Sequence, residues 1–370
     1  MPWYILCSVA AVTSAMIGVL WDISWHQSIG RDTFWTLAHL AIHLCGILAG
    51  ISCGFLILNT TFAQQSPLRG AAVRIWGFRG PLGAFIAAWG GIAMLTSAPF
   101  DNWWHDAYGL DVKILSPPHM VLAAGIVAVQ VGALILILGY MNRASGEQQA
   151  RLRALFLYVG GMILVALSTV SLELTSRVFM HSAHFYRVVA TIAPLVLVGV
   201  ARAARYKWAA TAVAGIYMVF VMLMDWILPL FPAVPKLGPV LYPVTHFVPS
   251  GFPMLLIVPA FALDLLWQRT AHWGAWSQSL VSGIVFLGTF AAAQWPFGSF
   301  LMSPAARNWF FGTIYFGYNT NPLGLYARYH FVAPETTAVF WREAALALLL
   351  SVLLIRLALA WGDRLQRIQR

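Results

Sequence analysis

Charged residues are scarce in this chain, and acidic residues are the scarcest. Only 9% of the 370 residues are charged, and they divide into 12 Asp and Glu against 22 Lys and Arg. An ordinary soluble domain carries charge on about a quarter of its residues. This composition argues against a soluble globular enzyme, and it makes the position of each acid and each histidine informative.

Cysteine motifs and nucleic-acid-binding patterns are lacking as well. The three cysteines, Cys7, Cys45 and Cys53, form no CxxC pair and lie in apolar segments, so they support neither a disulfide framework nor a thiolate metal site. The formal net charge is +10, but no basic stretch is interleaved with aromatic residues on a soluble domain. We therefore expect no nucleic-acid partner, and we interpret the basic residues as membrane-orientation signals.

Long apolar segments dominate what is present. Hydrophobic residues make up 60% of the chain, and they occur in segments of about 18 to 25 residues, which is long enough to cross a bilayer as helices. The expected segments are 3–20, 33–58, 80–98, 118–141, 154–172, 185–203, 208–230, 250–267, 277–296 and 337–361. Runs of this length without alternation exclude a β-barrel. The sequence predicts an all-α fold, a polytopic transmembrane helical bundle of about ten helices in a lipid bilayer.

Basic residues orient this bundle. Short cytoplasmic loops retain Lys and Arg, and such residues gather in alternate connections and at the C-terminus: Arg69, Arg74 and Arg79; Arg143, Arg151 and Arg153; Arg202, Arg205 and Lys207; Arg364, Arg367 and Arg370. We therefore expect a multi-pass protein of the inner (cytoplasmic) membrane with both termini cytoplasmic.

The apolar segments pair into repeated helical hairpins. We expect a metal-binding four-helix region at 1–141, for the reasons given below, and further transmembrane helices at 142–370. The loops at 231–249 and 297–336 fall on the extracytoplasmic side and are longer than a hairpin connection needs. They are expected to cap a site or to dock partner subunits.

One acid–histidine pattern occurs twice. It consists of an aspartate, a histidine four residues later, a second aspartate six residues further on, and a histidine at the start of the next apolar segment. The two copies are Asp22, His26, Asp32 and His39, and then Asp101, His105, Asp111 and His119. Residues this scarce, recurring in one order, indicate one or two metal sites.

The spacing suits metal coordination. An aspartate and a histidine four residues apart project from one face of a helix, and the last histidine can close on them across the hairpin. One carboxylate and two imidazoles suit Cu, Zn, non-haem Fe or Mn, and the absence of Cys or Met at these positions argues against a soft Cu(I) site. We predict a first ligand set, Asp22, His26 and His39, and a second ligand set, Asp101, His105 and His119.

Three further residues have supporting roles in this interpretation. Asp32 and Asp111 can be fourth ligands or can orient an imidazole N–H, and we favour the second role. His43 lies one turn beyond His39 and either supports the site or bonds to a neighbouring helix. Helix capping explains a single acid or histidine at a helix end, but it explains neither the fixed interval nor its recurrence.

Both ligand sets resemble those of a known family, the C subunit of the copper-dependent membrane monooxygenases (the particulate methane and ammonia monooxygenases). That subunit carries Asp-x3-His-x12-His and then Asn-x3-His-x13-His on tandem helical hairpins. The first ligand set matches the first pattern, together with the local runs Trp-His-Gln and Arg-Asp-Thr. The second ligand set matches the second pattern, with Asp in place of Asn and a proline close before the last histidine. The resemblance covers about the first 120 residues.

This resemblance implies a copper protein that oxidises a small apolar substrate with oxygen, with Asp101, His105 and His119 as the candidate catalytic residues. Zinc or iron would fit the same donors. Two alternatives stay open. One is a copper-transport or copper-handling membrane protein. The other is a b-type haem electron-transfer protein with His39, His43 and His119 as axial ligands, although haem ligation would not require the repeated aspartates.

Overall fold

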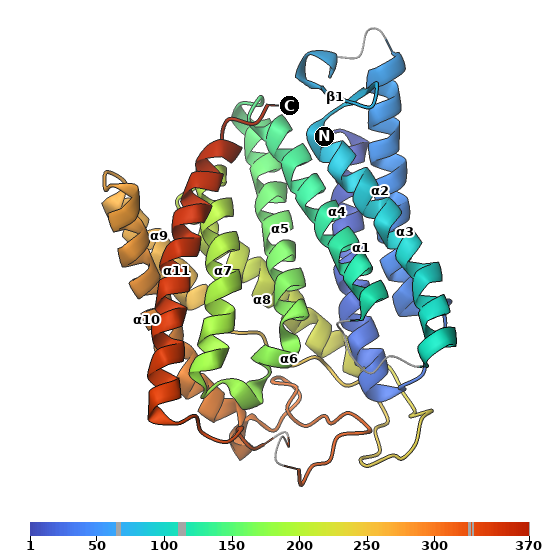
Figure 1. Ribbon diagram of the computed structural model, residues 1–370, viewed down its shortest axis with the longest axis vertical. Helices are drawn as coiled ribbons and strands as arrows, with labels where there is room; N and C mark the ends of the chain where they lie inside the picture. Colours follow the sequence, from blue (N-terminus) through green and yellow to red (C-terminus); the bar gives the residue numbers. More distant parts are fainter. Residues whose placement is uncertain (64–67, 110–115, 325–326, 328, 370) are drawn as a thin grey trace. The chain divides into compact units, whose positions relative to one another are not determined.

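The computed structural model describes residues 1–63, 68–109, 116–324, 327 and 329–369, and long helices dominate them (Figure 1). The helices are α1 (Trp3–Ser28), α2 (Leu37–Phe62), α3 (Leu82–Tyr108), α4 (Pro117–Met141), α5 (Gly146–Val170), α6 (Leu172–Thr175), α7 (Ala183–Ala204), α8 (Ala209–Ile227), α9 (Ile257–Thr270), α10 (Ala275–Leu301) and α11 (Thr337–Leu365). Short 3-10 turns η1 to η4 lie at Arg69–Ala71, Arg177–Phe179, Leu228–Leu230 and Pro304–Ala306. The all-α prediction is confirmed.

A small hairpin is an addition that the hydropathy pattern did not reveal. Strands β1 (Val73–Ile75) and β2 (Phe78–Gly80) pair antiparallel, with Ile75 opposite Phe78. The two turn residues, Trp76 and Gly77, both have positive φ, at 47° and 89°. Positive φ at both central residues matches the twist of paired strands, so the turn directs the chain back towards α3.

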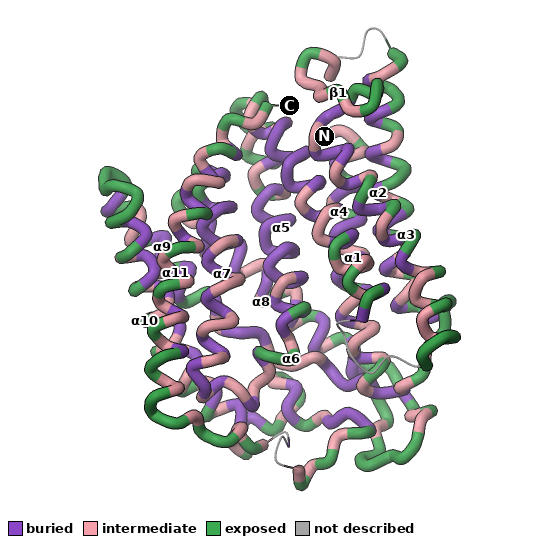
Figure 2. Tube along the Cα trace, viewed as in Figure 1, coloured by how far each residue is buried: buried purple, intermediate pink, exposed green. Residues whose placement is uncertain are grey.

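Nine helices of the described chain are long and apolar enough to cross a membrane. Helix α2 shows why a lipid environment is needed. One face of it is buried, whereas the other presents large exposed apolar side chains along its full length: Leu37, Leu40, Leu44, Ile47, Ile51, Phe55, Leu58 and Phe62. Figure 2 shows this mixture of buried and exposed residues on the long helices. An apolar stripe of this length in water would drive association, and lipid covers it instead.

The chain divides into two compact units. The first consists of Met1–Val19, Thr33–Ala166 and Arg364–Arg370, and the second of Leu20–Asp32 and Leu167–Asp363. Three divisions fall within α1, α5 and α11, and a fourth falls in the connection between α1 and α2. The expected boundary between a metal-binding region at 1–141 and further helices at 142–370 concerns function and stays a prediction.

In the first unit, glycines let α3 and α4 pack backbone against backbone. A Cβ at Gly90 would lie 2.7 Å from the carbonyl oxygen of Gly125, and one at Gly125 would lie 2.9 Å from that of Gly90. Small residues permit this close approach in membranes, where lipid supplies no hydrophobic driving force between helices. The packing fixes the end of α3 relative to α4, which starts with Pro117 and Pro118 in its first turn.

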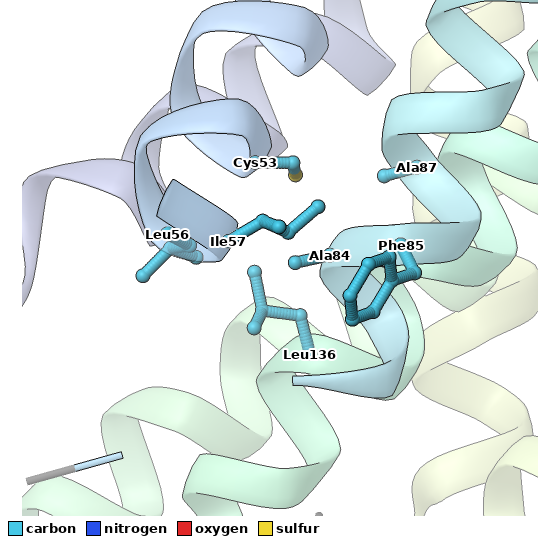
Figure 3. Close-up of a cluster of buried hydrophobic side chains, with 7 residues drawn as sticks. All are labelled: Cys53, Leu56, Ile57, Ala84, Phe85, Ala87 and Leu136. Atoms are coloured by element: carbon cyan, nitrogen blue, oxygen red, sulfur yellow. The ribbon is translucent and has the colours of Figure 1, made fainter. Parts of the chain in front are cut away.

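An apolar cluster joins α2 to this helix pair (Figure 3). Its buried members are Cys53, Leu56 and Ile57 of α2, Ala84, Phe85 and Ala87 of α3, and Leu136 of α4. Cys53 and Cys45 are both wholly buried and form no disulfide. These two cysteines are therefore small core side chains.

In the second unit, the helix predicted at 250–267 is wrong in its first half. Helix α9 begins only at Ile257. Gly251 has a φ of +118°, which is outside the range of a right-handed helix, and Pro253 disfavours the helical conformation of the residue before it. Hydropathy detects lipid-compatible residues and does not register this local break.

The eighth apolar segment nevertheless runs back along α8. The Met254 amide donates to the Tyr217 hydroxyl at the middle of α8, at 3.2 Å. Further on, Asp264 accepts from the Thr211 amide at the start of α8, at 2.8 Å. Residues 249–256 form neither helix nor strand, and the Leu256 amide closes a tight turn on the Met254 carbonyl at 2.7 Å. Helix α9 has 14 residues, or about 21 Å, and is by itself shorter than the roughly 30 Å hydrocarbon core. The eighth apolar segment is therefore composite: an irregular stretch is followed by a short helix.

Candidate metal centres

The C-terminal end of α1 gathers three of the residues singled out from the sequence. Asp22 and His26 lie one helical turn apart, with His26 Nε2 3.8 Å from Asp22 Oδ2. Asp32 places its Oδ2 3.4 Å from the same nitrogen. In the described part of the chain, this is the only group of three or more His, Cys, Asp or Glu side chains whose ligand atoms all lie within 4.8 Å of one another. We call it the α1 cluster.

A tight turn folds Asp32 back over the end of α1. The amides of Ile29 and Gly30 both donate to the Trp25 carbonyl, at 2.8 and 3.1 Å. The Trp25 indole N–H then donates to the Arg31 carbonyl at 2.9 Å. Gly30 has a φ of +83°, a left-handed value that a residue with a side chain adopts only under strain. The local sequence therefore brings the second aspartate to the histidine.

Loops from later in the chain fasten this turn. The Ser24 hydroxyl donates to the Val248 carbonyl at 2.6 Å, and the Val248 amide donates to the Ser28 hydroxyl at 2.8 Å. The Lys236 amide donates to the Ile29 carbonyl at 2.8 Å. The loop after α8 thus lies against the end of α1, as a cap on the cluster would.

The loop after α10 approaches the same turn. The Tyr318 amide donates to the Gln27 carbonyl at 3.1 Å, and a Cβ on Gly30 would overlap the Tyr318 hydroxyl. The second long loop therefore packs directly on the turn that carries Asp32, and Gly30 is required both for its φ and for this close approach.

His39 and His43 lie at the start of α2 in the first unit. His39 Nδ1 is 3.0 Å from the Thr33 carbonyl oxygen. The His43 ring stacks on Phe34, with ring centroids 5.0 Å apart, and lies 6.3 Å from the His39 ring. Because both histidines lie on one face of one helix, they are not arranged as opposed axial ligands of a single haem.

The second ligand set is brought together by the α3–α4 hairpin. His105 Nε2 lies 3.4 Å from Asp101 Oδ2, one turn earlier on α3. His119 Nε2, from the first turn of α4, lies 3.5 Å from Asp101 Oδ1. The carboxylate therefore contacts both imidazoles through different oxygens. We call Asp101, His105 and His119 the α3–α4 cluster.

Two features of the α3–α4 cluster resemble a ligand arrangement. Asp101 Oδ1 is shielded from solvent and accepts no hydrogen bond within the described chain, and its near neighbour is the His119 ring. His105 Nδ1 lies 3.2 Å from the Gly109 carbonyl oxygen. A histidine that donates its Nδ1–H to a backbone carbonyl presents an unprotonated Nε2, which is the form that binds metal.

A glycine recurs at the same offset in both copies, and the sequence interpretation missed it. Gly30 follows His26 by four residues, and Gly109 follows His105 by four residues. Both have positive φ, at 83° and 89°. Comparing the copies residue by residue would have found it, since glycine is the residue that most readily adopts positive φ just after a helix. Asp111, the remaining member of the second copy, lies outside the described residues.

Comparisons with known proteins add no family assignment. No family model, no curated protein and no solved structure matches this chain.

Proposed function

We propose that this chain is a copper-binding membrane protein similar to the C subunit of the copper-dependent membrane monooxygenases. The observation that supports this is the recurrence, at two helix ends, of a carboxylate and an imidazole one turn apart with their polar atoms 3.4 to 3.8 Å from each other. Independent helix caps have no reason to repeat this contact. Zinc or iron fits the same donors, and copper is preferred on the resemblance in spacing.

The residues fit a bound metal ion in three respects. Their donors are carboxylate oxygens and imidazole nitrogens, which suit Cu(II), Zn(II) and Fe(II). Asp101 Oδ1 is a shielded acceptor that a cation would satisfy. The Nδ1 atoms of His39 and His105 each lie near a backbone carbonyl, which leaves Nε2 for coordination. The first ligand set would hold one ion and the second ligand set another, with Asp32 beside the first.

The candidate catalytic residues are those of the α3–α4 cluster. Bound copper supplies one-electron redox chemistry toward oxygen, and the protein supplies position and charge. The Asp101 carboxylate, which contacts both imidazoles, would offset the positive charge of a bound ion. The Gly109 carbonyl accepts from the His105 Nδ1–H and holds the ring in place. The exposed apolar faces of the long helices would let a small apolar substrate arrive through lipid.

The test is copper analysis of the purified protein together with electron paramagnetic resonance. Two bound copper ions, with nitrogen hyperfine structure, are expected. Oxygen consumption that depends on a small apolar substrate would support oxidation. If His26→Ala, His39→Ala, His105→Ala and His119→Ala all retain the parent's copper content and spectrum, neither set binds metal.

Copper handling is the second candidate function, and the exposure of the α1 cluster favours it. The His26 side chain is 42% exposed, whereas sites for oxidation chemistry exclude water. An exposed site can accept or release an ion in exchange with a donor protein. Copper-dependent transfer to a chelator, without substrate-dependent oxygen use, would select this function over the first.

Membrane orientation and partners complete the proposal. Both termini are placed in the cytoplasm, and both acid–histidine clusters on the opposite face of the inner membrane, because Lys and Arg gather in the intervening loops. Partner subunits are proposed on that face. Cysteine labelling that places residue 105 in the cytoplasm would contradict the orientation, and a fully active purified monomer would contradict the need for partners.

A further inference from the structure

The hairpin formed by β1 and β2 carries two arginines directly opposite each other. Arg74 of β1 pairs with Arg79 of β2 in the antiparallel register, and both side chains are exposed. The Arg79 amide donates to the Thr61 hydroxyl at 2.8 Å, and that hydroxyl lies 3.1 Å from the Arg79 carbonyl oxygen. Both backbone groups therefore point away from β1, as in a non-hydrogen-bonded pair, where the Cα atoms lie only about 4.5 Å apart. Like charges directly opposite each other destabilise a hairpin.

No acid in the surrounding chain offsets this charge. Residues 33–100 contain no aspartate or glutamate, and Asp101 lies at the far end of α3, about 28 Å along the helix from its start. Glu147, the acid at the start of α5, is engaged with Arg151 at 2.6 Å. No ion pair within the described chain involves either hairpin arginine. An anion from outside the chain, bound between the two guanidiniums, would remove the repulsion.

The tip of the hairpin lies against the lipid-facing side of α3. Trp76, in the turn, packs on Trp89 with ring centroids 5.6 Å apart. Trp89 lies about 10 Å along α3 from Leu82, and its side chain is exposed, as is that of Ile92 one turn further on. The hairpin therefore runs down along a membrane-spanning helix, and its tip reaches the depth at which tryptophan side chains meet the lipid headgroups.

The residue at the tip is unusual for its position. Trp76 has a φ of 47° and is 85% exposed, whereas a turn of this kind favours Asn, Asp or Gly. A bulky residue at positive φ is an outlier, and here the side chain gains little burial within the protein in return. Phe78, beside it on β2, is exposed too. Contact with lipid would cover both aromatic side chains, so the hairpin combines apolar surface with a pair of cations.

We propose that the β1–β2 hairpin binds an anionic phospholipid, with Arg74 and Arg79 on the headgroup phosphate and Trp76 beside the lipid chains. A guanidinium matches a phosphate with two parallel hydrogen bonds. A lipid is favoured over a soluble phosphate because the tip of the hairpin lies on the lipid-facing Trp89. The site lies at the start of α3, whereas the α3–α4 cluster lies at its end, and it does not depend on copper.

The test is photo-crosslinking of the full-length protein in nanodiscs that contain equal amounts of phosphatidylglycerol and phosphatidylcholine. In each experiment one of the two lipids carries a diazirine on its acyl chain, and peptide mass spectrometry measures the labelling of residues 68–89. The parent should be labelled at least about fivefold more by phosphatidylglycerol, the factor that one arginine near an anionic surface contributes. The double variant Arg74→Met/Arg79→Met should be labelled almost equally by both lipids. Arg151→Met removes an arginine that is already paired with Glu147, so this matched control should keep the preference.

Arg79→Glu separates lipid binding from folding of the hairpin. It places opposite charges across the two strands, which stabilises their pairing, but it leaves no net positive charge for the phosphate, so the preference should disappear. Equal labelling of the parent by the two lipids overturns the proposal, and so does a preference that Arg79→Glu retains. If sodium phosphate, added against sodium chloride at equal ionic strength, abolishes the preference of the parent, the pair binds a soluble anion and the lipid proposal is overturned as well.

Discussion

The α1 cluster and the α3–α4 cluster contain similar side chains but are built by different means. The first draws all its residues from 22 to 32, within one helix end and the turn that follows it. The second places His119 of α4 against Asp101 of α3, so it depends on how two helices pack. A repeated sequence pattern can therefore be assembled locally in one copy and by tertiary contact in the other. A substitution in the turn after α1 should therefore affect the α1 cluster alone, and a substitution in the α3–α4 packing should affect the α3–α4 cluster alone.

The largest effect is expected from removing one imidazole from each cluster. His26→Ala should empty the first site and leave the second filled, and His105→Ala should do the converse, because a lost ligand weakens binding by roughly tenfold or far more. Copper content per chain, measured by mass spectrometry of the metal, checks this. Loss of both ions in either variant would show that the two clusters form one coupled centre.

The next largest effect should come from the α3–α4 packing. Gly90→Ala puts a methyl group 2.7 Å from the Gly125 carbonyl oxygen, and such overpacking costs about 1–3 kcal/mol. The α3–α4 cluster should lose copper while the α1 cluster keeps it. Gly54→Ala on α2 is the control, since no atom lies within 4 Å of its added Cβ. Equal copper retention in both variants would mean that the packing does not position His119.

A substitution at Gly30 should weaken copper binding at the α1 cluster and not at the α3–α4 cluster. Gly30→Ala forces a left-handed residue to carry a side chain where the Tyr318 hydroxyl lies, so the α1 cluster should bind copper more weakly and the α3–α4 cluster should not change. Gly109→Ala has a similar φ but open space around its Cβ. Its ψ of −175° places it in a region that is occupied almost only by glycine, so this substitution should cost about 1–3 kcal/mol of backbone strain without a steric clash. Copper titration followed by electron paramagnetic resonance distinguishes the sites, and matching behaviour of the two variants would refute the packing argument for Gly30.

The smallest effect concerns Asp32. Asp32→Asn keeps the shape of the side chain and removes the charge 3.4 Å from His26 Nε2. If Asp32 only orients the imidazole, copper affinity at the first site should fall about ten- to a hundredfold. A loss as complete as that of His26→Ala would instead make Asp32 a direct ligand, and the first site would then differ from the second in its donors as well as in its construction.

The fold class could be predicted because lipid imposes a strong rule: long apolar runs must satisfy their own backbone, and helices do so. Helix ends were less predictable. Helix α5 begins at Gly146 and not near 154, since its first turns are polar and carry the Glu147–Arg151 pair at 2.6 Å. Hydropathy locates lipid contact, and a helix can extend beyond it.

The candidate sites were predictable to a different degree. The four-residue spacing of Asp101 and His105 fixes their contact on any helix, so their proximity follows from the sequence. The approach of Asp32 to His26 depends on the turn at Gly30, where a glycine four residues after the histidine recurs in both copies. The sequence does not reveal which distant loops pack on that turn, such as the loop that places the Tyr318 hydroxyl against Gly30, because no local pattern specifies such contacts.

The composite eighth segment has a consequence for biosynthesis. An insertion machinery that reads hydropathy would treat 250–267 as a complete span as soon as it is translated. The Leu255 amide, however, donates to Gln294 Oε1 at 2.8 Å, and Gln294 belongs to α10, which is translated later. Unsatisfied amides are costly in lipid, so this stretch must pass through a provisional conformation and adopt its final one after α10 arrives. A nascent chain arrested before residue 275 should therefore hold these residues differently from the finished protein.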